Sequence, residues 1–260
     1  MKELIYDKGK IIIADSPEEL SGQQFIDIAG ILHNKRAPLQ ASIEALRVLC
    51  NKTALSFYLL PNEVKLNCLP HVQWVFEDLN ITAQLIPEYN GFYGPAAEFK
   101  NLTLSEFYFS ENAWQELVKE KTDDALCHLV TILYRMPKKD YNKQKDEDGD
   151  IRQPFNNSTV PYYKKQISQW PKEVLQAIAI WYDACREKLR KDNPEIYPQT
   201  EVQSADADEA DMFGILRGLA GGKYGDFEKV EKLPLYTALY ELNFLIAENK
   251  RLEAEVNSSK

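Results

Sequence analysis

Residues 211–255 read DMFGILRGLAGGKYGDFEKVEKLPLYTALYELNFLIAENKRLEAE. The apolar spacing predicts a short helix, a glycine hinge and then a long amphipathic helix that ends in charged residues. The rest of the chain is predicted to form a helical body to which this segment is attached. The glycines of 218–226 lack the GxxxxGK[ST] spacing of a phosphate-binding loop, and no strand precedes them. A helix C-cap and turn explain them better, because glycine adopts positive φ at little cost.

The long helix carries the best candidate for a partner-binding surface. Its apolar positions recur at alternating steps of four and three residues from Leu235 to Asn249, as in a coiled coil. Leu245 and Leu252 widen this face, which favours packing against a globular body over a narrow two-stranded coiled coil. Docking into the chain's own core is favoured over an exposed partner site, and both stay open. The predicted partner-binding residues are Leu235, Leu239, Leu242, Leu245, Ile246 and Leu252.

Composition limits the class of protein. The chain has 260 residues, of which 44% are apolar and 11% aromatic, so it can form a real core. Its net charge of −9 argues against binding to nucleic acid or anionic membranes, because no basic surplus exists to neutralise phosphates. The N-terminus MKELIYDKGK lacks the features of a signal peptide, and no apolar run approaches a membrane span. We therefore expect the protein in the cytoplasm of the cell that makes it.

Local signals along the chain predict a mainly α fold: a multi-helix globular body with a small N-terminal β-hairpin and a C-terminal helical unit. The hairpin is predicted for residues 3–13. Helix starts are marked by Ser21 with Gln24 and by Thr103 with Glu106, which have capping-box spacing. Further helices are predicted for 38–50, 123–135, 160–170 and 171–190. We expect a body over 1–198, an acidic linker over 199–209 and the C-terminal unit over 210–256.

Cysteines and histidines give no sign of a metal site. The four cysteines are widely spaced and form no CxxC pair, and the three histidines are scattered. We expect the thiols to be buried and free in a reducing compartment. No cofactor is expected. The four cysteines are Cys50, Cys68, Cys127 and Cys185.

Residues 137–158 form the main polar interruption and are predicted to be an exposed loop. Asp146, Asp148 and Asp150 alternate there, as in a calcium loop. The match fails, because Gly149 lies between the second and third acids and Asn157 occupies the closing twelfth position. Arg152 is spaced to form a local ion pair with Asp150. Such a pair is worth about 0–1 kcal/mol when exposed, and more if it ties the loop to the helical body.

Several motifs occur together over most of the chain. They are GFYGP (91–95), NLTLSEFYFSE (101–111), LYR (133–135), GDIRQPF (149–155), WYDACR (181–186), the proline after Tyr197, and LRGLAGG (216–222) with FEKVEKLPLYTALYELNFLIAEN (227–249). In this combination the chain resembles proteins from the tail-gene regions of bacteriophages and prophages. The C-terminal segment is similar to parts of tail assembly chaperones encoded beside the tape-measure protein.

The resemblance implies a mostly helical, non-enzymatic protein that keeps the tape-measure protein soluble and helps to recruit tail-tube subunits. The expected partner is therefore a tape-measure or tail-tube protein in the host cell cytoplasm. One alternative is a structural or connector protein of the virion that assembles as a homo-oligomer. Another is a metal-dependent enzyme that uses the three aspartates of 146–150; an enzyme is the less favoured reading.

Overall fold

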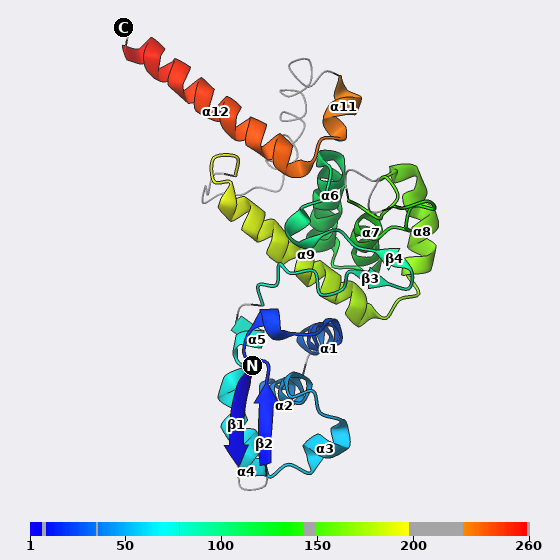
Figure 1. Ribbon diagram of the computed structural model, residues 1–260, viewed down its shortest axis with the longest axis vertical. Helices are drawn as coiled ribbons and strands as arrows, with labels where there is room; N and C mark the ends of the chain where they lie inside the picture. The colour runs from blue at the N-terminus through cyan, green and yellow to red at the C-terminus, as the bar shows by residue number, and fades with distance from the viewer. Residues whose placement is uncertain (7–8, 35, 78, 143–148, 198–225, 259–260) are drawn as a thin grey trace. The chain divides into compact units, whose positions relative to one another are not determined.

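The computed structural model describes residues 1–6, 9–34, 36–77, 79–142, 149–197 and 226–258 of this chain. The fold is mainly helical, as predicted, and the expected N-terminal hairpin is present (Figure 1). No helix in these ranges is long and apolar enough to cross a membrane. The chain divides into two compact units. The first comprises 1–86 with 169–184, and the second comprises 87–168 with 185–260.

The first unit begins with the hairpin. Strands β1 (Lys2–Tyr6) and β2 (Gly9–Ile13) pair antiparallel, with Lys2 opposite Ile13. Ile11 and Ile13 are buried while Ile12 is exposed, so β2 has the alternation of a strand with one covered face. The hairpin is followed by a 3₁₀ turn, η1 (Pro17–Glu19), and by the helices α1 (Gly22–His33), α2 (Pro38–Leu49), α3 (Ala54–Tyr58), α4 (Asn62–Cys68), η2 (Leu69–Val72) and α5 (Trp74–Glu77).

Helix α1 begins where the sequence predicts. The Ser21 side chain accepts from the Gln24 amide, and the Gln24 side chain accepts from the Ser21 amide, so the capping box is complete. Gly22 is the first residue of α1 and packs closely against the backbone of Leu85. A Cβ added at Gly22 would lie 2.3 Å from the Leu85 carbonyl oxygen. Helix α9 (Lys172–Asp192) is long, and its residues up to Ala184 belong to this unit. There the Trp181 indole donates to the Thr82 carbonyl over 3.3 Å.

The second unit is built around three helices that lie side by side (Figure 1). They are α6 (Leu104–Glu120), α7 (Asp123–Leu133) and α8 (Val160–Ile167). Thr103 and Glu106 complete the predicted capping box of α6, and Thr122 caps α7. The shorter elements are β3 (Glu88–Tyr89), β4 (Phe92–Tyr93), η3 (Ala97–Phe99), η4 (Asn157–Thr159) and α11 (Phe227–Glu231).

Helix α12 (Leu235–Ser258) belongs to the second unit and continues the chain after α11. The predicted short helix, glycine hinge and acidic linker fall within 198–225, outside the described residues. The predicted domain division at residue 198 therefore stays a prediction.

Candidate functional site

The start of α12 is fixed to the start of α6. The Leu235 amide donates to the Leu102 carbonyl, and the Leu104 amide donates to the Leu233 carbonyl, each over 2.9 Å. These bonds form a short antiparallel bridge between Thr103 and Pro234. The backbone of the second unit therefore sets where the long helix begins.

One side of α12 contacts the rest of its unit. Leu235, Leu239 and Leu242 are buried. Polar contacts continue along this side of the helix: the Asn243 amide donates to Asn193 over 2.9 Å, and Lys250 forms an ion pair with Glu195. The first half of α12 is thus part of the unit's core, as the favoured sequence interpretation expected.

At the first turn, the Tyr236 hydroxyl donates to the Glu98 carbonyl over 2.7 Å. Burial, and then the nearby Glu98 carboxylate, raise the pKa of Tyr236. This contact adds a second attachment between α12 and the segment that precedes α6.

The second half of α12 exposes large apolar side chains. Leu245, Leu252 and Val256 are 36%, 47% and 55% exposed, and their spacing of seven and four residues puts them on one side of the helix. We call these three residues the exposed strip. Phe244 and Tyr240 are also exposed, but they lie on another side of α12.

The six predicted partner-binding residues therefore separate into three groups by their exposure. Three are buried in the second unit: Leu235, Leu239 and Leu242. Ile246 is half-buried, and Leu245 and Leu252 belong to the exposed strip. Whether any of them binds a partner stays a prediction. Val256 was missed because the predicted pattern followed Leu239 and Ile246 and ended at Asn249.

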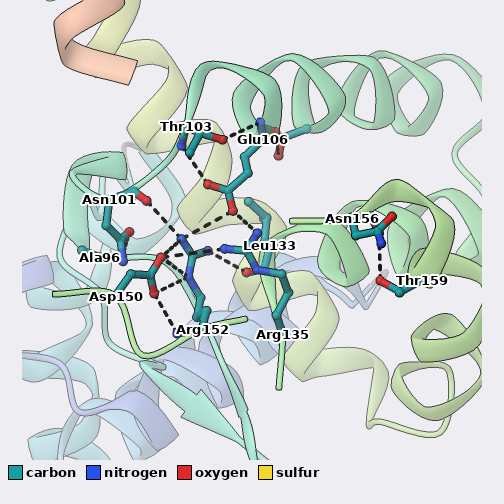
Figure 2. A network of polar contacts seen from close by, with 11 residues as sticks. Ala96, Asn101, Thr103, Glu106, Leu133, Arg135, Asp150, Arg152, Asn156 and Thr159 are labelled. Atoms are coloured by element: carbon teal, nitrogen blue, oxygen red, sulfur yellow. Dashed lines mark hydrogen bonds and ion pairs between the residues drawn. The ribbon is translucent and has the colours of Figure 1, made fainter. Parts of the chain in front are cut away.

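A buried ion network lies in the same unit (Figure 2). It consists of two arginines and two carboxylates that are each at least nine-tenths buried. Glu106 comes from α6, Arg135 follows α7, and the other two come from the segment after Gly149. The members are Glu106, Arg135, Asp150 and Arg152.

Arg152 is the centre of this network and is 1% exposed. Its Nε donates to both Asp150 carboxylate oxygens over 3.0 Å, and its Nη2 donates to Oδ2 over 2.7 Å. The remaining donors reach backbone carbonyls: Nη1 donates to Leu133 over 3.1 Å and Nη2 to Asn101 over 3.2 Å. The planar guanidinium thus joins three segments that are distant in sequence.

Arg135 completes the charge balance. It forms an ion pair with Glu106, and its Nη2 lies 3.8 Å from Asp150 Oδ2. Burial, and then the positive charge of Arg152, lower the pKa of Arg135 to about 10, while Glu106 and Asp150 act in the opposite direction. The two positive and two negative groups stabilise one another away from water, where unpaired charges are costly.

The prediction that 137–158 is an exposed loop is wrong for Asp150 and Arg152, which are buried, while Asn156, Asn157 and Ser158 are exposed as predicted. The Lys138 amide donates to Ile151, and the Gln153 amide donates to Met136, so the returning chain pairs with the strand-like segment after α7. Polar composition suggested exposure, but Asp150 and Arg152 neutralise each other and are buried together. The sequence had identified the pair itself.

This pairing also removes Asp150 as a free ligand. Its two oxygens accept from Arg152, which leaves it poorly placed to bind a cation. Asp146 and Asp148 lie outside the described residues. In the part of the chain that is described, no group of three His, Cys, Asp or Glu side chains could hold a metal ion.

A second buried ion pair joins α9 to α6. The Arg186 Nε donates to both Glu111 oxygens over 3.0 and 2.9 Å, and Arg190 Nη2, one turn further along, lies 3.6 Å from the same carboxylate. Helix α6 thus supplies two buried carboxylates of this unit, Glu106 and Glu111, in addition to Asp150 from the segment after Gly149. Both arrangements hold helices and loops in place.

The four cysteines are buried and none of them forms a disulfide, as predicted. Burial raises the pKa of Cys50 and of Cys185 to about 12, so both thiols stay protonated at neutral pH. The pKa values of Cys68 and Cys127 are also raised by burial. A protonated, buried thiol is a poor nucleophile.

An open hollow of about 440 Å³ lies in the first unit, beside α1, α2 and α5. Ile31, Leu32 and Phe76 give it apolar walls, and Arg36 and Glu77 are charged lining residues. Arg36 already forms an ion pair with Glu44. The lining has neither cysteine nor histidine, and its hydroxyl group, that of Ser42, donates to the Pro38 carbonyl over 3.0 Å.

The exposed strip includes two of the predicted partner-binding residues, Leu245 and Leu252, and exposed apolar side chains on one side of a helix are the kind of surface that protein partners cover. Comparisons of this chain with models of protein families, with curated proteins and with solved structures found no match.

Proposed function

We propose that this chain is a tail-assembly chaperone or accessory protein of a bacteriophage, which binds the tape-measure protein in the host cytoplasm while the tail is built. The exposed strip of α12 is the observation that carries the proposal. The resemblance of the motifs between residues 91 and 249 to phage tail-region proteins adds the identity of the partner.

The chemistry of the strip suits this task. A tape-measure protein is long and helical with apolar faces, which aggregate if they stay exposed. A helix that lies along α12 covers its own apolar face and the exposed strip at the same time, as in other helix-binding proteins. The first half of α12 is anchored in the second unit, so the binding surface is held on a fixed element.

The test is co-expression of the chain with the tape-measure protein encoded in the same tail region. We expect the chain to keep the tape-measure protein soluble and to co-purify with it. The variant Leu245→Glu/Leu252→Glu should lose both effects, because it places charge in the strip. Leu55→Glu/Leu59→Glu is the matched control, since these leucines are exposed on and beside α3 in the first unit.

Equal yields of soluble tape-measure protein with both double variants would contradict the proposal. Mass spectrometry of finished particles gives a separate check. A chaperone leaves before the tail is complete, so the chain should be absent from them. Stoichiometric amounts in mature tails would replace the proposal with a structural or connector role.

A further inference from the structure

The exposed strip continues a regular heptad seam along α12. The seam alternates steps of three and four residues over the whole helix, which is the spacing of coiled-coil a and d positions. Its first three members are buried in the second unit, and the next members are exposed. The seam runs through Leu235, Ala238, Leu242, Leu245, Asn249, Leu252 and Val256.

Acidic side chains border the exposed part of this seam. Glu248 takes the g position before Asn249, and Glu253 takes the e position after Leu252, so one carboxylate lies on each side. The neighbouring cations occupy positions away from the seam. Lys250 pairs with Glu195, and Arg251 Nε lies 3.7 Å from Glu255.

From this arrangement we infer that α12 binds a helix with an apolar seam flanked by lysine or arginine. The identity of that helix as part of the tape-measure protein rests on the proposed function; its chemistry rests on α12 alone. Basic groups at the flanking positions would meet Glu248 and Glu253 across the interface, in the arrangement by which e and g charges select partners.

A second copy of this chain is a poorer occupant of the seam. In a parallel pair, Glu248 of one copy faces Glu253 of the other. In an antiparallel pair g positions face g positions, and Glu241, Glu248 and Glu255 all occupy g. Either arrangement opposes like charges. Asn249 does not count against a second copy, because a parallel in-register pair places Asn249 opposite Asn249. It does require a polar group at the facing position of any partner helix.

Two labelled synthetic peptides of about three heptads test this inference with the full chain. Both have leucine at d, one asparagine at a, and otherwise apolar a positions. The basic peptide has lysine at e and g, and the acidic peptide has glutamate there. Fluorescence anisotropy should show the basic peptide binding at least about tenfold more tightly at low salt, with a smaller difference at high salt.

The variant Glu248→Lys/Glu253→Lys should reverse this preference. The matched control is Glu63→Lys/Glu120→Lys, which makes the same charge change at exposed positions on α4 and α6 and should leave the preference unchanged. Leu245→Glu/Leu252→Glu should abolish binding of the basic peptide.

The outcomes separate this inference from the proposed function. Equal affinity for both peptides overturns the charge selection. Failure of the basic peptide to bind, while the tape-measure protein still co-purifies, overturns the inference and leaves the chaperone proposal standing. If the basic peptide binds but the tape-measure protein does not co-purify, the inference stands and the chaperone proposal is overturned. A dimer of the chain that Leu245→Glu/Leu252→Glu dissolves would make a second copy the occupant and overturn the inference.

Discussion

The Arg152 guanidinium binds the Asp150 carboxylate inside the second unit, with Nε 3.0 Å from both oxygens and Nη2 2.7 Å from Oδ2. The pair is two residues apart in sequence, yet Arg152 is almost completely buried. Its other donors bind carbonyls at Leu133 and Asn101, so a local pair holds distant segments together.

Replacing Arg152 by methionine should lower the free energy of unfolding by about 3–5 kcal/mol, because it leaves Asp150 buried without its main partner. Urea unfolding followed by circular dichroism measures this loss. Lys164→Met is the control: it removes a 2.7 Å ion pair with the exposed Asp124 and should cost only about 0–1 kcal/mol. Similar losses in the two variants would show that the buried network does not stabilise the fold.

Alkaline pH should destabilise the protein through Cys185. Burial raises the pKa of this thiol from 9.0 to about 12, so the unfolded chain releases the proton at a lower pH than the folded chain. The stability from this group is fully present below pH 9 and is lost as pH rises towards 12. The slope is at most about 1.4 kcal/mol per pH unit.

The measurement is the free energy of unfolding in urea between pH 8 and pH 10.5 for the wild type and for Cys185→Ala. We expect the wild-type curve to fall more steeply over this range, because only the wild type has the Cys185 thiol, while the other three buried thiols are present in both proteins. Parallel curves would mean that Cys185 titrates alike in both states.

Gly22→Ala should destabilise the first unit by about 1–3 kcal/mol, as overpacking does. The new Cβ would lie 2.3 Å from the Leu85 backbone oxygen, which cannot rotate away as a side chain can. Thermal unfolding of the two proteins measures the difference. Gly91→Ala is the comparison: its Cβ would meet nothing within 4 Å, and its φ of +79° should cost only about 1 kcal/mol. A larger loss at Gly91 would contradict the contact between α1 and Leu85.

Asn249→Leu should make the chain self-associate. The substitution joins Leu245 and Leu252 into an unbroken apolar seam and removes the polar group that penalises wrong pairings. Light scattering after size exclusion, over increasing protein concentration, should show a shift towards dimers. Asn257→Leu adds the same side chain at an exposed position off the seam and should cause a smaller shift. Equal behaviour of the two variants would mean that the heptad register has no influence.

Sequence reasoning succeeded where the cause is local. The two residues of each capping box, Ser21 with Gln24 and Thr103 with Glu106, are only three residues apart. Their spacing in the sequence is therefore enough to identify the helix start. The second role of Glu106 could not be seen in this way, because its ion-pair partners Arg135 and Arg152 are far along the chain. Their meeting depends on how the segment after Gly149 returns to α7.

The same distinction explains the outcome on α12. The periodicity predicted a long helix with an apolar face, and it gave Leu245 and Leu252 as members of that face. Which part of this face is covered depends on hydrogen bonds from α12 to Leu102 and Asn193, which lie in other segments of the chain. Local pattern therefore gave the helix, while tertiary contacts decided which of its leucines are exposed.

Helix α9 has a consequence for synthesis on the ribosome. Its residues up to Ala184 complete the first unit, where Trp181 donates to Thr82, yet they are translated about a hundred residues after that unit's earlier part ends at Ile86. At a synthesis rate of about 5–20 residues per second, several seconds pass between translation of Ile86 and translation of the helix that completes the unit. A fragment that stops at Ile86 lacks this helix, so it should emerge with apolar surface uncovered and require protection from aggregation until Ala184 has left the exit tunnel.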